Sequence, residues 1–212
     1  MRTQTVLPGS ASRTQRGFTL MELMVVLAIV GVIMGLAVPN FGLYIRNSRL
    51  TGAANDVLGS ITRARTEAIK RQLPVAVCAT ADPNAATPVC STAATAWRLG
   101  WVVWVDADND WVPDNNLNEP VLDRHPALDV SLTVRSNNSD RVKYGATGFT
   151  APPGAFVSTT NIAMCDDRGT ELTTASVSAA RAIRITATGR PRVTKDQIEV
   201  DTALAAIGQA CP

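Results

Sequence analysis

The side chains best suited to holding a ligand lie near the end of the chain. Residues 181–195 contain five cations and no acid, namely Arg181, Arg184, Arg190, Arg192 and Lys195. The planar guanidinium of arginine matches the oxygens of a phosphate through two parallel hydrogen bonds. This window is therefore suited to contact with a polyanion, but from the residues alone a solvated β-turn with basic residues is the favoured interpretation.

Two residues in this window constrain the backbone. Gly189 can adopt turn conformations that other residues disfavour, and Pro191 stiffens the chain after it. In the polyanion interpretation, Arg190 and Arg192 would project from a pre-ordered loop and contact neighbouring phosphates without reading base sequence. On electrostatic grounds the site also includes two further cations, Arg184 and Lys195.

A catalytic set is hard to assemble from this sequence. The sole histidine, His125, precedes Pro126 in a predicted loop. Neither a serine elbow nor a reactive-cysteine signature accompanies it. We therefore expect no enzymatic activity, against the alternative of a secreted or anchored hydrolase.

An acidic turn follows a predicted strand near the middle of the chain. Asp106, Asp108 and Asp110 have the 1, 3, 5 spacing of a calcium loop, in which carboxylates converge on one cation. Position six is Trp111 rather than glycine, and position twelve is Leu117 rather than glutamate. Asx-rich turns also hydrogen-bond their own backbone without metal. A hairpin turn is therefore favoured over a calcium site, and we assign no metal and no cofactor.

Tryptophans cluster in the same region and could stack on bases. They are Trp97, Trp101, Trp104 and Trp111. The first three do not share one face of a strand, so we expect packing in a core or an interface.

The elements that position these residues begin with an apolar segment at residues 18–38, whose single charge is Glu22. As a helix it would span about 30 Å, the thickness of a bilayer core. Arg13 and Arg16 favour a cytoplasmic N-terminus. A signal peptide cleaved near residues 35–37 and a plain single-pass anchor are alternatives, but neither explains an acid within the membrane, which by default indicates function.

The charge of the chain is unevenly distributed. Residues 1–17 carry three arginines and no acid, whereas the whole chain has a formal charge of +2. Without that segment the remainder would carry −1. Bulk charge therefore does not argue for nucleic-acid binding, and only local charge can.

The rest of the chain has an α+β pattern. Apolar residues at helical spacing predict an amphipathic helix over residues 44–72, continuous with the apolar segment except for an interruption near Pro39. The predicted buried stripe is Leu50, Ala54, Val57, Ile61, Ala64 and Ala68. Short runs of β-branched or aromatic residues then predict antiparallel strands. Those runs are residues 75–80, 99–106, 130–135, 141–144, 156–164 and 181–186.

Four cysteines follow the membrane segment, on the predicted periplasmic side. An even number in an oxidising compartment predicts two disulfides, for which three pairings exist. We favour Cys78–Cys90, which closes a hairpin-sized loop, and Cys165–Cys211, which ties down the C-terminal tail. A zinc site is the alternative, but the sequence has no CxxC motif.

The start of the apolar segment, Arg16-Gly17-Phe18-Thr19-Leu20-Met21-Glu22-Leu23, resembles the class III signal of type IV pilins and type II secretion pseudopilins. The resemblance implies that a prepilin peptidase cuts between Gly17 and Phe18 and that Phe18 becomes N-methylated. Glu22 would be the fifth mature residue and would meet the N-terminus of a neighbouring subunit in the filament. Pro39 falls where pilins commonly have a helix-kinking proline.

Later residues resemble the FimT/GspH family of minor pilins and pseudopilins. They are Ala64–Arg71, Cys78, Gly100-Trp101, the Asp106 turn and Gly189-Arg190. In the FimT branch a Gly-Arg-x-Arg motif is associated with DNA binding during natural transformation. Residues 189–192, Gly-Arg-Pro-Arg, match this motif at each fixed position.

The resemblance implies three regions and a pilin-like fold. Residues 1–17 would be the leader, 18–43 the membrane and filament-core helix, and 44–212 a periplasmic or extracellular domain in which the second half of the helix packs on antiparallel sheet. The protein would be a single-pass inner-membrane minor pilin that joins a surface pilus with other pilins and binds DNA. The alternatives are a GspH-like type II secretion pseudopilin, a pilin that only primes assembly, and an adhesin for acidic polysaccharide.

Overall fold

The computed structural model describes residues 17–91, 96–116, 118–137, 141–150 and 159–211. Several predicted features lie outside these residues. They are leader residues 1–16, position twelve of the calcium-loop comparison (Leu117), and residues 156–158 of a predicted strand. The chain divides into two compact units, Met1–Leu43 and Tyr44–Pro212, which we describe separately.

The described part of the first unit is helical from Leu20 onward. Helix α1 (Leu20–Arg71) begins here, and the Thr19 hydroxyl caps it by accepting from the amide of Glu22 at 3.1 Å. Every described side chain of this unit is exposed, Phe18 by 84%. Over the described residues no single helix is both long and apolar enough to cross a membrane. One candidate arises only when Leu20–Leu36 and Phe41–Arg71 are taken together.

In the second unit, α1 buries the stripe that the sequence predicts. Leu50, Val57 and Ile61 are fully buried, as are the alanines at neighbouring turns. The helix continues through Pro39, but its segments Leu20–Leu36 and Phe41–Arg71 are bent relative to each other there, near the interruption that the sequence predicts. It ends at Arg71, and Gln72 follows with a positive φ of 55°.

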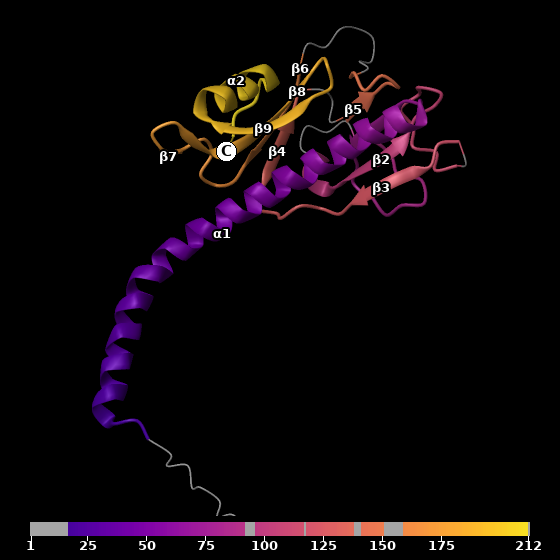
Figure 1. The fold of residues 1–212 in the computed structure, drawn as a ribbon. Coiled ribbons are helices and arrows are strands. Elements are labelled where there is room, and N and C mark those ends of the chain that lie inside the picture. The colour runs from indigo at the N-terminus through magenta and orange to yellow at the C-terminus, as the bar shows by residue number, and fades with distance from the viewer. Residues whose placement is uncertain (1–16, 92–95, 117, 138–140, 151–158, 212) are drawn as a thin grey trace, which may run out of the picture. The chain divides into compact units, whose positions relative to one another are not determined.

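Two antiparallel sheets pack against this part of α1 (Figure 1). The first has the order β3-β2-β1-β5. Its strands are β1 (Val75–Ala79), β2 (Trp101–Val105), β3 (Val121–His125) and β5 (Arg141–Tyr144). The second has the order β4-β6-β8-β7, with β9 also paired to β8. Its strands are β4 (Thr133–Ser136), β6 (Thr159–Cys165), β7 (Leu172–Thr174), β8 (Val177–Thr186) and β9 (Pro191–Asp196).

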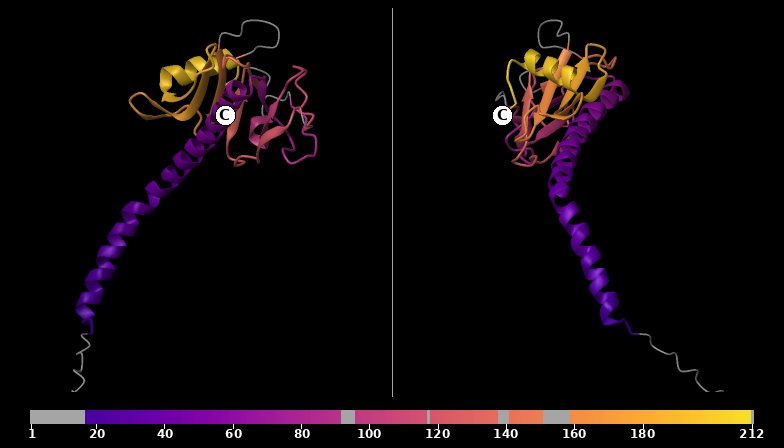
Figure 2. Two further views of the ribbon diagram at one scale, coloured as in Figure 1. Left: turned by 45° about the vertical axis from the view of Figure 1, so that its right-hand side comes forward. Right: turned by 90° about the vertical axis from the view of Figure 1, so that its left-hand side faces the viewer.

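Side chains alternate between the two faces of the second sheet. Ile183 and Ile185 on β8 enter the main core with α1, whereas Ala180 and Ala182 face helix α2 (Gln197–Ile207). The sheet therefore lies between the two helices (Figures 1 and 2). A short 3-10 helix, η1 (Ala96–Leu99), contributes Trp97 to the main core.

The structure confirms the α+β plan and both favoured disulfides. Cys78–Cys90 and Cys165–Cys211 have Cα–Cα distances of 5.5 and 5.9 Å. The strand expected over residues 130–135 begins only at Thr133, because Asp129 caps the preceding turn by accepting from the amide of Ser131. Strands β3, β7 and β9 and helix α2 were not predicted from the sequence.

Candidate nucleic-acid interface

The basic window forms a β-hairpin rather than an extended loop. β8 and β9 pair with Arg184 opposite Arg192 and Ile185 opposite Pro191. The connecting turn closes through the amide of Gly189, which donates to the carbonyl of Thr186 at 2.8 Å. Arg190 is thus the last residue of the turn, and Arg192 already belongs to a strand.

Gly189 is required by both its conformation and its surroundings. Its φ is +76°, a region that favours glycine. A side-chain carbon there would overlap the carbonyl oxygen of Gly148 and lie 3.0 Å from Cε1 of Tyr144. The turn is therefore seated on the segment after β5, with no room for another residue type.

Arg65 on α1 braces this turn from inside the molecule. Its guanidinium donates from Nε to the Gly148 carbonyl at 3.0 Å and from an Nη to the Thr188 carbonyl at 3.2 Å. The Thr150 hydroxyl donates to the Ala187 carbonyl at 3.2 Å. Sequence reasoning used Arg65 only as part of a family pattern and missed this role, which only the three-dimensional contacts reveal.

The cations of the window have different surroundings. Arg190 and Arg192 are exposed, whereas Arg184 is half-buried and its Nε has no acceptor among the described residues. Arg184 and Arg192 share one face of the sheet, because directly paired residues point to the same side. Lys195 is exposed but falls on the opposite face of β9, three positions beyond Arg192.

Arg181 is committed to structure. Its guanidinium donates to the carbonyls of Ser178, Ala179 and Ala180 at 3.0–3.2 Å. Burial lowers the pKa of this guanidinium, and the charge of nearby Arg168 adds to the effect. Arg181 is therefore a backbone-binding residue rather than a surface cation.

An acidic residue from outside residues 181–195 lies against the face of the sheet that carries Arg184 and Arg192. Glu199, in the first turn of α2, forms an ion pair with Arg192. Hydrogen bonds from the Thr194 hydroxyl and from Arg192 hold the pKa of the Glu199 carboxyl below its usual range. The face is consequently less positive than the sequence window indicates.

Other residues with potential chemistry are accounted for by packing. The His125 ring stacks on Trp101 with a centroid separation of 3.8 Å and an interplanar angle of 3°. Trp97, Trp101 and Trp104 are fully buried, which confirms the expected packing role. Trp101 and Trp104 enter different clusters, on opposite faces of β2.

The acidic turn also behaves mainly as expected. Asp108 accepts from the amide of Asp110 at 3.1 Å, and Asp110 accepts from the amide of Val112 at 2.7 Å. These are Asx turns that satisfy their own backbone. The turn thus makes the backbone hydrogen bonds that the hairpin-turn interpretation expects, and Asp106 and Asp108 have a further acidic neighbour, Glu119.

An N-terminal helix followed by antiparallel sheet defines a type IV pilin-like protein. Residues 53–189 match the family described as "Type II transport protein GspH", and residues 12–38 match the "Prokaryotic N-terminal methylation motif". The chain belongs to the GspH family, a group of minor pilins and pseudopilins.

Individual relatives resemble shorter stretches. The chain is 48% identical over 58 residues to "Pilin-like protein PilA1" of Thermus thermophilus, covering 27% of this chain and 36% of that protein. It is 37% identical over 54 residues to a "Fimbrial protein" of Pseudomonas aeruginosa, covering 26% and 35%. The matches thus span about a third of the length of these relatives.

A crystal structure of the Pseudomonas aeruginosa type IV minor pilin FimU has the same fold. Its TM-score is 0.50 at 18% identity, and the match covers 71% of this chain and 92% of that one. Pilins and pseudopilins are structural, non-enzymatic proteins, so the family confirms the expectation that this chain is no enzyme. The N-terminal motif implies prepilin processing, membrane anchoring and assembly with other pilins.

Proposed function

We propose that this protein is a minor type IV pilin, of the FimT branch, that binds DNA non-specifically and aids its uptake in natural transformation. The observation that carries the proposal is the braced turn at Gly189, which presents Arg190 and Arg192 on an exposed hairpin. A site held in one conformation loses little conformational entropy when it binds.

The proposed contact set consists of Arg190, Arg192 and Arg184. The first two supply exposed guanidinium groups, and Arg184 lies directly opposite Arg192 on β8. The geometry gives Lys195 only a long-range electrostatic part, because it lies on the other face of β9. The Gly189 backbone positions the arginines and need not touch the ligand.

Two or three phosphate contacts make one subunit a weak binder. The slope of log affinity against log salt should be roughly −2 to −3 for this number of contacts. Tight capture would need several subunits or motifs along one DNA, as a filament of pilins would provide.

The proposal also covers how the N-terminal segment is processed, anchored and assembled. Prepilin peptidase would cut between Gly17 and Phe18, Phe18 would be methylated, and residues 18–43 would form a single-pass inner-membrane helix before assembly. Glu22 would then meet the positive N-terminus of a neighbouring subunit and neutralise a charge buried in the filament. The matched methylation motif at residues 12–38 supports this part.

The test is titration of a fluorescent DNA duplex with the full-length protein in non-ionic detergent at several salt concentrations. We expect weak binding with the slope given above, and no binding by the Arg190→Glu/Arg192→Glu double variant. Equal affinity of wild type and a normally melting double variant would contradict the proposal.

The second candidate is a structural subunit that binds no DNA. The family match over residues 53–189 carries the description of a type II transport protein, which favours a GspH-like pseudopilin or an assembly-priming pilin. Secretion genes beside the coding sequence, together with no DNA binding by the wild type, would support this candidate. Pilus and competence genes there would support the first.

A further inference from the structure

Three carboxylates lie close together within the connection between β2 and β3, away from the basic hairpin. They belong to Asp106, Asp108 and Glu119, and one oxygen of each lies within 4.8 Å of the others. Asp106 and Glu119 are buried, with 0% and 4% of their surface exposed, and Asp108 is exposed. The group differs from the 1, 3, 5 set suggested by the sequence, because Glu119 takes the place of Asp110.

One of the two buried acids, Glu119, has a hydrogen-bond partner for only one of its carboxylate oxygens. Oε1 of Glu119 accepts from the amide of Asp108 at 3.0 Å, but Oε2 is buried with no partner among the described residues. Asp106 is fully buried and forms an ion pair with the buried side chain of Lys143, so the unpartnered Oε2 of Glu119 is the atom that points to a further ligand. A buried carboxylate oxygen without a partner is costly, so the arrangement calls for a positively charged ligand.

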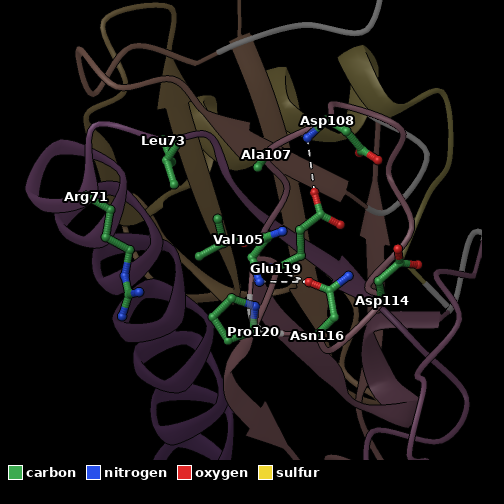
Figure 3. Close-up of a pocket in the computed structure, with 10 residues that line it drawn as sticks. Arg71, Leu73, Val105, Ala107, Asp108, Asp114, Asn116, Glu119 and Pro120 are labelled. Carbon is green, nitrogen blue, oxygen red and sulfur yellow. Dashed lines mark hydrogen bonds between the residues drawn. The ribbon is translucent and has the colours of Figure 1, made fainter.

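The loop holds Glu119 in place and leaves an opening beside it. Oδ1 of Asn116 accepts from the amides of Asn118 and Glu119 at 2.8 and 2.9 Å. Figure 3 shows the carboxylates of Asp108, Glu119 and Asp114 around one pocket, from which a ligand can reach Glu119. The pocket therefore brings solvent to buried Glu119 and to exposed Asp108.

We propose that Asp106, Asp108 and Glu119 bind a calcium ion. Calcium prefers carboxylate and amide oxygens, takes six to eight of them in flexible geometry, and binds at about 2.3–2.6 Å. Two such bonds span up to about 5 Å, so the observed spacing lets one ion touch all three carboxylates without backbone movement. Water completes the shell from the open side.

The charges favour a divalent ion. The three acids carry −3 if all are ionised, and Lys143 supplies one positive charge at Asp106. Lys143 is itself held by the Trp111 ring, whose centroid lies 4.0 Å from Nζ. One calcium ion would balance the remaining two charges. Extracellular calcium modules of this kind bind with dissociation constants of about 0.1–1 mM.

The test is calcium binding by the full-length protein in non-ionic detergent after treatment with EGTA. Calorimetry should give one ion per chain, and terbium should show luminescence sensitised by tryptophan, which calcium displaces. A calcium concentration ten times the dissociation constant should raise the melting temperature by about 3–6 °C. The site is independent of the DNA proposal, and neither result bears on the other.

Glu119→Gln is the decisive variant, because glutamine keeps the size of the side chain and can still accept from the Asp108 amide. It should melt no lower than the wild type in EGTA and should lose the calcium-dependent rise. Asp110→Asn is the matched control, since Asp110 lies outside the carboxylate group, and it should keep the rise. No calcium binding by the wild type at 5–10 mM (about ten times the weakest constant expected), or an unchanged response in Glu119→Gln, would overturn the proposal.

Discussion

Arg192 on β9 forms an ion pair with Glu199 in the first turn of α2. The pair places an acid against a guanidinium of the proposed DNA-contact set, although residues 181–195 contain none. A phosphate that binds Arg192 must displace this carboxylate or share the guanidinium with it. If Arg192 contacts DNA as proposed, Glu199 would therefore compete with the phosphate for its guanidinium.

Replacing Glu199 should strengthen DNA binding. Glu199→Gln removes one negative charge from the face and frees Arg192, so we expect affinity to rise roughly two- to fivefold at low salt. Anisotropy titration of a labelled duplex measures this rise. Asp201→Asn, which removes the same charge from the same helix, should change affinity less. A fall in affinity for Glu199→Gln would show that the ion pair supports the site instead.

Gly189 should tolerate substitution worse than another glycine of the same conformation. Gly189→Ala incurs both an unfavourable φ and overlap with Gly148, and should lower the unfolding free energy by about 2–3 kcal/mol. Gly208 has φ +72° with nothing within 4 Å of an added carbon, so Gly208→Ala should cost only about 1 kcal/mol. Thermal melts of both variants test this difference. Equal losses would contradict the seating of the turn on Gly148.

Protonation of Asp166 should lower the stability of the fold at low pH. Burial raises the pKa of this carboxyl, but hydrogen bonds from Arg168 outweigh that effect and hold the pKa below its usual range. Arg168 also donates to Asn47 on α1 at 3.1 Å. A depressed pKa stabilises the fold above the unfolded-state pKa of about 3.9 and loses this contribution as the pH falls below it.

Asp166→Asn should therefore lower the unfolding free energy by about 2–3 kcal/mol at pH 7, with the difference from wild type shrinking below about pH 4. Melting temperatures from pH 7 to pH 2.5 measure this change. Asp167→Asn is the control, because Asp167 pairs with Arg46 at the exposed surface and should contribute under about 1 kcal/mol. A difference that stays constant down to pH 2.5 would rule out the proposed titration.

The N-terminus should be processed within the matched methylation motif. Mass spectrometry of the protein from its native membrane should find a chain that begins at N-methylated Phe18. Gly17→Val should block cleavage, because a bulky side chain crowds the bond to be cut. An intact segment of residues 1–17 in the assembled protein would contradict this assignment.

Much of the scaffold is predictable from local patterns. The stripe from Leu50 to Ala68 has helical spacing, and each predicted member is buried. The even number of cysteines predicts two disulfides, and the pairing favoured among the three possible ones is the one observed. Helix α2, which the sequence analysis missed, also has recognisable ends. Asp196 caps its start by accepting from the amide of Glu199, and Gly208 ends it with φ +72°.

The binding sites depend on contacts that local patterns do not encode. Pro191 and Gly189 make the start of β9 resemble a loop. Arg181 and Arg184 fall on opposite faces of β8, so the sequence does not show which face of this strand is buried. Arg65 on α1 approaches Thr188 in the turn between β8 and β9, and Glu119 approaches Asp106 across the connection between β2 and β3. Sequence reasoning therefore identified the basic window but missed its brace, its internal acid and the carboxylate group.

In the proposed function the exposed hairpin of β8 and β9 binds DNA, and the total charge of the protein does not determine the binding. The most direct measurement compares Arg190→Glu with Lys195→Glu, two exposed substitutions that change the charge equally but lie at different places on the hairpin. Arg190→Glu should reduce duplex affinity at least about tenfold, as loss of a phosphate contact and reversal of its charge predict, whereas Lys195→Glu should reduce it no more than about threefold. Equal losses, or no loss in either variant, would contradict the account.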